Sequence, residues 1–191
     1  MKKKAMKKSI LFLLFILSYL PNSAQETGTF KDPRDGKVYK KVKIGSQWIM
    51  AENLAYKPIS GNFWTYDNKS YNLEKYGYMY DWETAKTVTP KGWHLPSKDE
   101  WEQLYKSLGN DASKVYDAIK TNGSSGFNSV LSGYRHDDGK FSYEGSTAHF
   151  WSSSAESEFN AWNFNCYGDD KFALINRHRK LSGLSIRLIK D

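Results

Sequence analysis

Cysteine is almost absent from this 191-residue chain, in which Cys166 is the single cysteine. One cysteine cannot form an internal disulfide, so the stability of the fold must come from packing. Cys166 shares strand parity with Trp162 and Phe164. That alternation predicts a small buried residue rather than a reactive nucleophile.

The chain also lacks an apolar stretch long enough to span a bilayer. Residues 10–20 form an apolar run of eleven residues, whereas a spanning helix needs about 20. Five lysines precede this run and small residues follow it up to Ala24, which is the layout of a secretory signal. We therefore expect residues 1–24 to be a signal peptide cleaved near Ala24. The product would be secreted, periplasmic or at the cell surface, without a membrane span. It would not be a lipoprotein, because no cysteine lies near the cleavage site.

A basic surface for nucleic acid is missing as well. The formal charge of +7 includes the five early lysines, and the rest of the chain carries 23 basic and 21 acidic residues. The densest basic group, Lys40, Lys41 and Lys43, lies on a predicted strand rather than in a clustered stripe. A protein that binds the phosphate backbone needs such a stripe, so we expect no nucleic-acid partner.

Catalytic and metal-binding motifs are equally scarce. The four histidines, His94, His136, His149 and His178, show no metal-ligand spacing, and the run of serines at 152–154 is not in a nucleophile-elbow context. We expect no cofactor and no metal ion.

The most readable segment is residues 90–108. Ser97 is a good N-cap and Glu100 can complete a capping box, so a helix is predicted to begin at Ser97. Its spacing places Trp101 on an apolar stripe with Leu104, Tyr105 and Leu108, and Gly109 ends it. Trp93 and Trp101 are expected to anchor the core, and His94 to be a hydrogen-bonded core histidine.

The remaining elements follow from local patterns. Residues 38–44 and 47–50 predict a hairpin with Val38, Val42 and Ile44 facing a core and Tyr39 facing out. Residues 56–80 predict a long loop packed by aromatic side chains. A short helix is expected at 81–86, a second helix from the Asp111 cap to residue 120, and short strands from residue 127, with a sharp turn at 136–139. The pattern predicts one α+β domain over residues 25–191, with helices in the first half and short antiparallel strands in the second.

The segment GWHLPSKDEW at 92–101 resembles a signature of the Fibrobacter succinogenes major paralogous domain family. Further blocks resemble that family in order: residues 34–56, 76–85, 132–141, 150–156 and 185–191. The family is distantly similar to formylglycine-generating (sulfatase-modifying) enzymes, and the resemblance implies their C-type-lectin-like fold. Family members commonly carry two cysteines where this chain has Thr89 and Leu188, which implies the loss of one disulfide.

The same resemblance bears on catalysis. Formylglycine-generating enzymes hold copper with two active-site cysteines, and Cys166 alone cannot supply both. We therefore expect a protein that is not an enzyme.

The candidate ligand-binding residues are Asn163, Asn165, Tyr167, Arg135, Asp137 and Asp138. Alternation in the segment AWNFNCY predicts that Asn163, Asn165 and Tyr167 share one outward face near the polar turn, and amides with an aromatic ring suit a sugar. A merely solvated strand face is the alternative. The acidic pairs at 137–138 and 169–170 could offer oxygens to calcium, but a sugar-binding C-type lectin carries Trp-Asn-Asp where this chain has Trp162, Asn163 and Phe164. We therefore expect turn formers rather than a calcium site.

These residues favour an exported, non-catalytic binding module for a glycan or cell-surface ligand. The alternative is a structural or surface protein–protein interaction domain, in which exposed aromatic rings such as Tyr66, Tyr71 and Tyr78 contact a protein partner. A third possibility is an oxidase related to formylglycine-generating enzymes.

Overall fold

The structure is a computed structural model that describes residues 25–191, so the predicted signal peptide at 1–24 lies outside the described residues. Within 25–191 there are three sheets and four α-helices. The first sheet runs in the order β1 (Thr27–Lys31), β2 (Val38–Ile44), β3 (Gln47–Met50), β12 (Ile189–Lys190), β6 (Trp93–His94). The second runs β11 (Phe172–Arg179), β10 (Asn160–Tyr167), β9 (Thr147–Ala155), β7 (Ser132–Arg135), β8 (Phe141–Glu144), and the third pairs β4 (Phe63–Trp64) with β5 (Met79–Tyr80).

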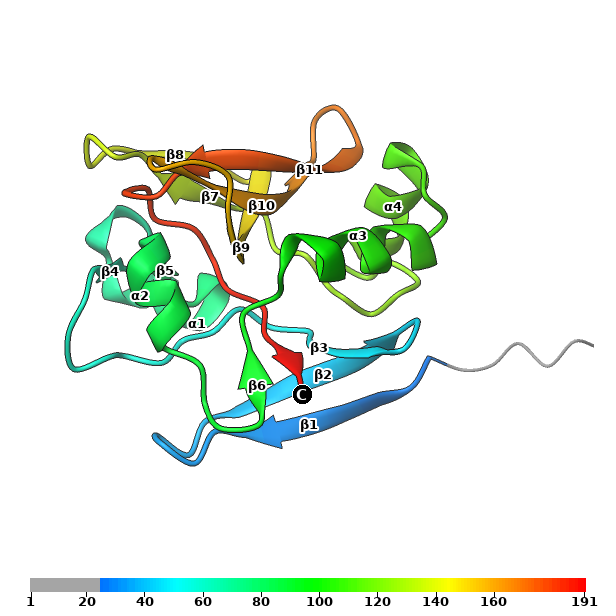
Figure 1. Ribbon diagram of the computed structural model, residues 1–191, viewed down its shortest axis with the longest axis horizontal. Helices are drawn as coiled ribbons and strands as arrows, with labels where there is room; N and C mark the ends of the chain where they lie inside the picture. Colours follow the sequence, from blue (N-terminus) through cyan, green and yellow to red (C-terminus); the bar gives the residue numbers. More distant parts are fainter. Residues whose placement is uncertain (1–24) are drawn as a thin grey trace, which may run out of the picture.

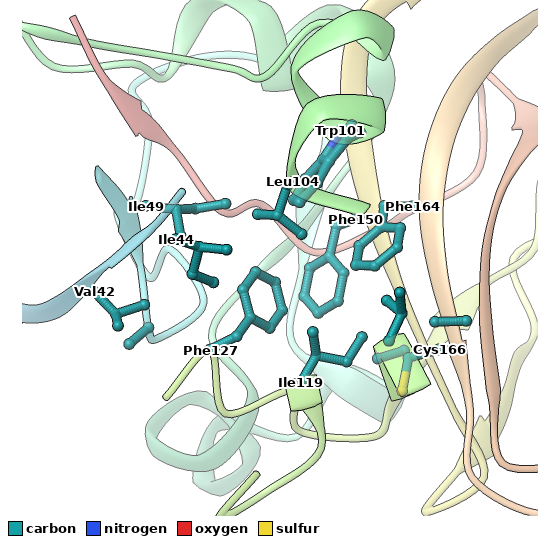
Figure 2. Packing of buried hydrophobic residues seen from close by; sticks show 14 of the residues in the cluster. Val42, Ile44, Ile49, Trp101, Leu104, Ile119, Phe127, Phe150, Phe164 and Cys166 are labelled. Atoms are coloured by element: carbon teal, nitrogen blue, oxygen red, sulfur yellow. The ribbon is translucent and has the colours of Figure 1, made fainter. Parts of the chain in front are cut away.

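The two larger sheets form separate layers, with α3 (Lys98–Ser107) and α4 (Ala112–Ile119) along one side of the molecule (Figure 1). The main hydrophobic core joins these layers. Side chains from β2 and β3 meet those of both helices and of the second sheet (Figure 2). Trp101 stacks on Phe164 with ring centroids 5.0 Å apart. No helix within the described range is long and apolar enough to cross a membrane.

Local capping signals locate both long helices correctly. Ser97 and Glu100 form the predicted capping box at the start of α3, and Asp111 accepts hydrogen bonds from the first turn of α4. Trp101 is fully buried and Trp93 is 6% exposed, as predicted. The short helix is also confirmed as α2 (Trp82–Thr87), capped by Asp81.

The predicted division into a helical first half and a stranded second half is wrong. The four helices, including α1 (Leu73–Tyr76), lie in mid-chain, and strands occur throughout residues 27–190. The second sheet is also not wholly antiparallel, because β7 and β9 pair in parallel. The error arose because β3 pairs with the late strand β12, which joins the early strands to the end of the chain in one sheet, and no local pattern reveals this long-range contact.

The predicted hairpin of β2 and β3 is present, but the orientation of its first residues is wrong. Val38 is 54% exposed, whereas Tyr39 is fully buried and its hydroxyl oxygen accepts a hydrogen bond from the backbone N–H of Ala55 at 3.1 Å. In this part of β2 both faces are buried: Val42 packs in the main core, and Tyr39 packs in a second apolar cluster on the opposite side. The predicted orientation assumed that only one face of the strand is buried, with apolar residues on that face alone, and this assumption fails here.

Residues 56–80 contain short elements rather than an unbroken loop: β4, β5, α1 and the 3₁₀ turns Tyr66–Asn68 and Ser70–Asn72. The aromatic packing is confirmed for Tyr66 and Tyr76, which are 6% and 2% exposed. Tyr71, in contrast, is 72% exposed. Most of these rings therefore fill a core rather than form a contiguous surface patch.

His94 does not lie in the core. Its side chain is 38% exposed and bridges two carboxylates, with Nδ1 2.7 Å from Asp191 Oδ1 and Nε2 2.7 Å from Glu100 Oε1. Although partial burial lowers the pKa of His94, these two acceptors outweigh it and hold the pKa above its ordinary value. The predicted hydrogen bonding is confirmed, and the predicted location is wrong.

The segment before β12 fixes the position of β9. Arg187 is fully buried and donates to the backbone carbonyls of Met50, Phe127 and Asn128 and to Oδ1 of Asn53. Two residues earlier, Ser185 pairs with β9, donating its N–H to His149 O at 3.0 Å and accepting from Trp151 N at 3.1 Å. The guanidinium thus ties the segment that borders β9 to the first sheet.

Candidate ligand-binding site

A cavity of about 340 Å³ lies on the face of the second sheet that points away from the main core. Strand alternation produces this arrangement. Phe164 and Cys166 of β10 face the core, so Asn163, Asn165 and Tyr167 face the other side. The lining combines residues from four strands and the turns between them: Tyr134, Tyr143, Ser146, Thr147, His149, Asn165, Tyr167, Asp169, Asp170, Asn176, Arg177 and His178.

Cross-strand register brings the polar side chains together. Asn165 of β10 is opposite His149 of β9, and Tyr167 is opposite Thr147. On the other side of β10, Asn163 is opposite Asn176 of β11. His178 lies two residues further along β11, and its ring centroid is 5.7 Å from that of His149. Antiparallel partners on one face are close neighbours, so the floor of the cavity is a patch of amides and imidazoles.

Several buried polar atoms of this patch have no hydrogen-bond partner among the described residues. They are His149 Nδ1, His178 Nδ1 and Asn165 Oδ1, and neighbouring Asn163 has neither amide atom paired. His149 is 3% exposed and Asn165 is 2% exposed. Leaving a buried polar atom unpaired costs about 1–3 kcal/mol, and most buried polar groups in proteins are paired. The floor is therefore prepared for hydrogen bonds that the protein itself does not make.

Aromatic rings form the walls of the cavity. Tyr134 lies edge-on to both histidines, with ring centroids 4.7 Å from His149 and 4.6 Å from His178. It also stacks on Tyr143 at 5.6 Å, and Tyr167 stacks on Phe172 at 4.6 Å. Tyr143 is 55% exposed, so the walls reach the surface.

Both floor histidines are neutral at physiological pH. Burial lowers the pKa of His149 to about 3, helped by the nearby His178 and opposed by the adjacent Asn165 amide. Burial also lowers the pKa of His178 to about 4, helped by His136. A neutral imidazole carries one donor and one acceptor nitrogen, so each ring can bind a neutral polar group.

The predicted site residues fall into two groups. Asn165 and Tyr167 line the cavity, and Asn165 Nδ2 donates to the Tyr167 hydroxyl at 3.2 Å. Asn163 shares their face, but it is fully buried and not solvated as expected. Larger rings on the neighbouring strands account for this, since Trp151 is its partner in register and packs against His178 with centroids 6.3 Å apart.

Arg135, Asp137 and Asp138 do not line the cavity. Arg135 lies over the Trp64 ring at 4.0 Å, Asp137 pairs with Arg179 at 3.4 Å, and Asp138 accepts from the backbone N–H of Lys140 at 3.0 Å. Asp138 thus forms the predicted turn. Within residues 25–191, no group of three His, Cys, Asp or Glu side chains is placed to hold a metal ion.

Sequence patterns missed His149, His178 and Tyr134. The sequence contains part of the information, because Thr147, His149 and Trp151 alternate with Ala148 and Phe150. This alternation indicates that the first three share one face of a strand. What links these residues is the pairing of β9 with β10 and of β10 with β11, together with the parallel contact of β7 with β9. Cys166 behaves as predicted: it is fully buried, and burial raises the pKa of its thiol to about 11.

No curated protein and no solved structure matches this chain. One family model does, the Fibrobacter succinogenes major domain, and it matches residues 42–190. The matched region includes every strand that lines the cavity and both long helices. The chain therefore belongs to the Fibrobacter succinogenes major domain family.

Proposed function

We propose that this protein is an exported, non-catalytic binding module for a glycan or another hydroxyl-rich cell-surface ligand. The ligand occupies the cavity over β9, β10 and β11. The observation that carries the proposal is the set of unpaired, buried polar atoms on the cavity floor, enclosed by tyrosine rings. Ligand sites commonly combine apolar or aromatic walls with a few convergent polar groups.

The chemistry of the walls and floor suits a sugar. A pyranose has an apolar face that stacks on an aromatic ring and an edge of hydroxyls that bond to amides and imidazoles. Tyr143 and Tyr167 offer such rings, and Asn165 offers an amide beside them. The C-type-lectin-like scaffold implied by the sequence is compatible with a ligand-binding role, and the predicted signal peptide is compatible with export.

The proposed binding does not depend on calcium. The acidic pair at 169–170 lies at the cavity rim, but the pair at 137–138 is held in an ion pair and a turn. Six to eight oxygen ligands are needed around calcium, and these two pairs do not converge within the described residues.

A thermal-shift screen against glycans and cell-wall fragments, run with calcium and with a chelator, tests the function. A ligand that binds only the folded state adds about 2.7 kcal/mol of stability at a hundredfold excess over Kd. We expect at least one fragment to raise Tm equally in both buffers. A hit that requires calcium would contradict the proposed mode, and the absence of any hit would favour the protein-partner alternative.

Matched variants locate the binding. Asn165→Leu removes a polar group from the floor, and Asn160→Leu makes the same change on β10 outside the cavity lining. We expect the first variant to abolish the thermal shift and the second to retain it. Equal loss in both variants would contradict the assignment of the cavity.

A further inference from the structure

Among residues 25–191, the cavity floor contains hydrogen-bonding groups but no charged group. His149 and Asn165 are almost fully buried, and His178 contributes its buried Nδ1. The carboxylates and the guanidinium of the lining belong to Asp169, Asp170 and Arg177, which are all exposed at the mouth. A ligand group that reaches the floor therefore leaves water without meeting a counter-charge.

The floor atoms specify which neutral group fits. Asn165 Nδ2 already donates to Tyr167, and Oδ1, which lies beside the His149 ring, makes no hydrogen bond of good geometry within residues 25–191, so it can accept from a donor of the ligand. Nε2 of His149 lies 3.1 Å from Thr147 Oγ1, and because this hydroxyl can donate or accept, Nδ1 of the same ring can do either. A sugar hydroxyl both donates and accepts, so it satisfies every combination.

A carboxylate fits the same atoms poorly. It has no proton to donate to Asn165 Oδ1, and burying it without a cation or several donors is costly. The imidazoles do not readily supply that cation. Protonating either one charges a buried ring next to another histidine, at a centroid distance of 5.7 Å.

The charges around the two imidazoles do not make the floor favourable for a carboxylate. Asp137 favours the protonated form of His178, but it is paired with Arg179 at 3.4 Å. The titratable and charged groups packed around the imidazoles are His136, Asp137, Tyr134, Tyr143, Tyr167, Arg177 and Arg179. At the mouth, two carboxylates and one guanidinium leave a net negative charge, which repels an anion.

We propose that the cavity is selective for an uncharged, hydroxyl-bearing sugar ring and rejects carboxylated sugars, with His149, His178 and Asn165 as the residues that determine this specificity. The inference rests on the proposed function, because it names the class of ligand for the same cavity.

The test is a set of matched probe pairs, each a neutral methyl glycoside or short oligosaccharide and the corresponding uronic acid. Suitable pairs are glucose with glucuronic acid, galactose with galacturonic acid and mannose with mannuronic acid. Affinities are measured by calorimetry or by amide NMR titration at pH 7, in low salt and in 1 M salt. In at least one pair we expect the neutral member to bind about tenfold more tightly or better.

The salt series separates the floor from the mouth. Repulsion by Asp169 and Asp170 is screened at high salt, whereas rejection by the buried floor is not. We expect the preference to persist in 1 M salt and in Asp169→Asn with Asp170→Asn. A preference that vanishes under both conditions would overturn the role of the floor.

Two variants test the residues themselves. His149→Phe removes the floor nitrogen, and His94→Phe makes the same change far from the cavity lining. We expect only the first to abolish binding of the neutral sugar. His178→Arg places a cation at the floor and should shift the preference toward the uronic acid, an effect that a merely structural role would not produce.

The outcomes distinguish the two proposals. A uronic acid that binds the unchanged protein as tightly as its neutral partner overturns the selectivity and leaves the binding function standing. If no probe in any pair binds, both the function and the selectivity are overturned.

Discussion

On β9 and β10, neighbouring residues point to opposite faces of one sheet, and much of both faces is buried. Phe150, Phe164 and Cys166 face the main core with no exposed surface (Figure 2). One residue along each strand, His149 and Asn165 are 3% and 2% exposed on the cavity face. The first set is apolar and well packed, and the second is polar and partly unpaired.

The comparison shows that burial alone does not identify a core. The core face gains stability from apolar contacts, whereas the cavity face carries polar atoms that lose water without gaining a partner. Departures from a fully satisfied interior are expected at functional sites. If the cavity face serves binding, substitutions on the two faces should have opposite effects on stability.

The largest effect is expected for Trp101→Ala, in the helix α3 that packs against the core face. The Trp101 ring is fully buried against Phe164 and Phe127, and Nε1 donates to Trp151 O at 3.2 Å. Truncating a buried tryptophan costs about 3–5 kcal/mol, a large part of the stability of one domain. Chemical denaturation should show a protein that is unfolded or nearly so. A fall in Tm of only a degree or two would contradict the central role of this ring.

The next effect is acid sensitivity of the cavity face. His149 and His178 have folded-state pKa values of about 3 and about 4, below the unfolded value of 6.5. Below pH 6.5 the unfolded chain binds protons that the folded chain does not, so stability falls as the pH falls. Each histidine should remove about 1.4 kcal/mol at pH 5.5 relative to its fully neutral state.

Denaturation curves at pH 7.5 and 5.5 measure this loss, and His149→Phe provides the test variant. We expect the variant to lose less stability on acidification than the parent protein. His94 is the internal control, because its effect on stability has the opposite sign to that of His149. Its raised pKa adds stability below pH 6.5, and that stability is lost as the pH rises through the folded pKa. An unchanged pH dependence in His149→Phe would show that this ring is not held neutral by burial.

A smaller effect of the opposite sign is expected for Asn163→Leu. The side chain of Asn163 is fully buried, and neither amide atom has a hydrogen-bond partner in the part of the chain that the structure describes; leucine has a similar volume without the polar atoms. Removing an unsatisfied group can be neutral or stabilising by about 1–3 kcal/mol. We expect Tm to stay the same or to rise. A clear loss of stability would mean that the amide is satisfied by ordered water, which can pair buried polar groups.

Local chemistry made part of this structure predictable. The capping residues Ser97 and Asp111 located α3 and α4, because a cap needs only its own first turn. Alternation along the strand placed Asn165 and Tyr167 on one face, because this pattern also depends only on neighbouring residues. The burial of Asn165, and the presence of His149 opposite it, depend on which strands pair and in which register. Those contacts join distant residues, so no short window of sequence contains them.

The smallest loss of stability is expected for Cys166→Ser, which introduces a polar atom on the core face. Cys166 is fully buried against the apolar cluster, and burial raises the pKa of its thiol to about 11. The thiol should therefore not react with alkylating reagents at pH 8 in the folded protein. A serine hydroxyl at this position would be buried among apolar side chains, so stability should fall by about 1 kcal/mol. Because Cys166 faces away from the cavity, binding of a neutral sugar should be unchanged.

The two substitutions on β10 compare its two faces within a single strand. Cys166→Ser should lower the stability slightly, whereas Asn163→Leu, three residues earlier, should leave it unchanged or raise it. Rapid alkylation of the folded protein, or loss of binding in Cys166→Ser, would contradict the separation of the two faces.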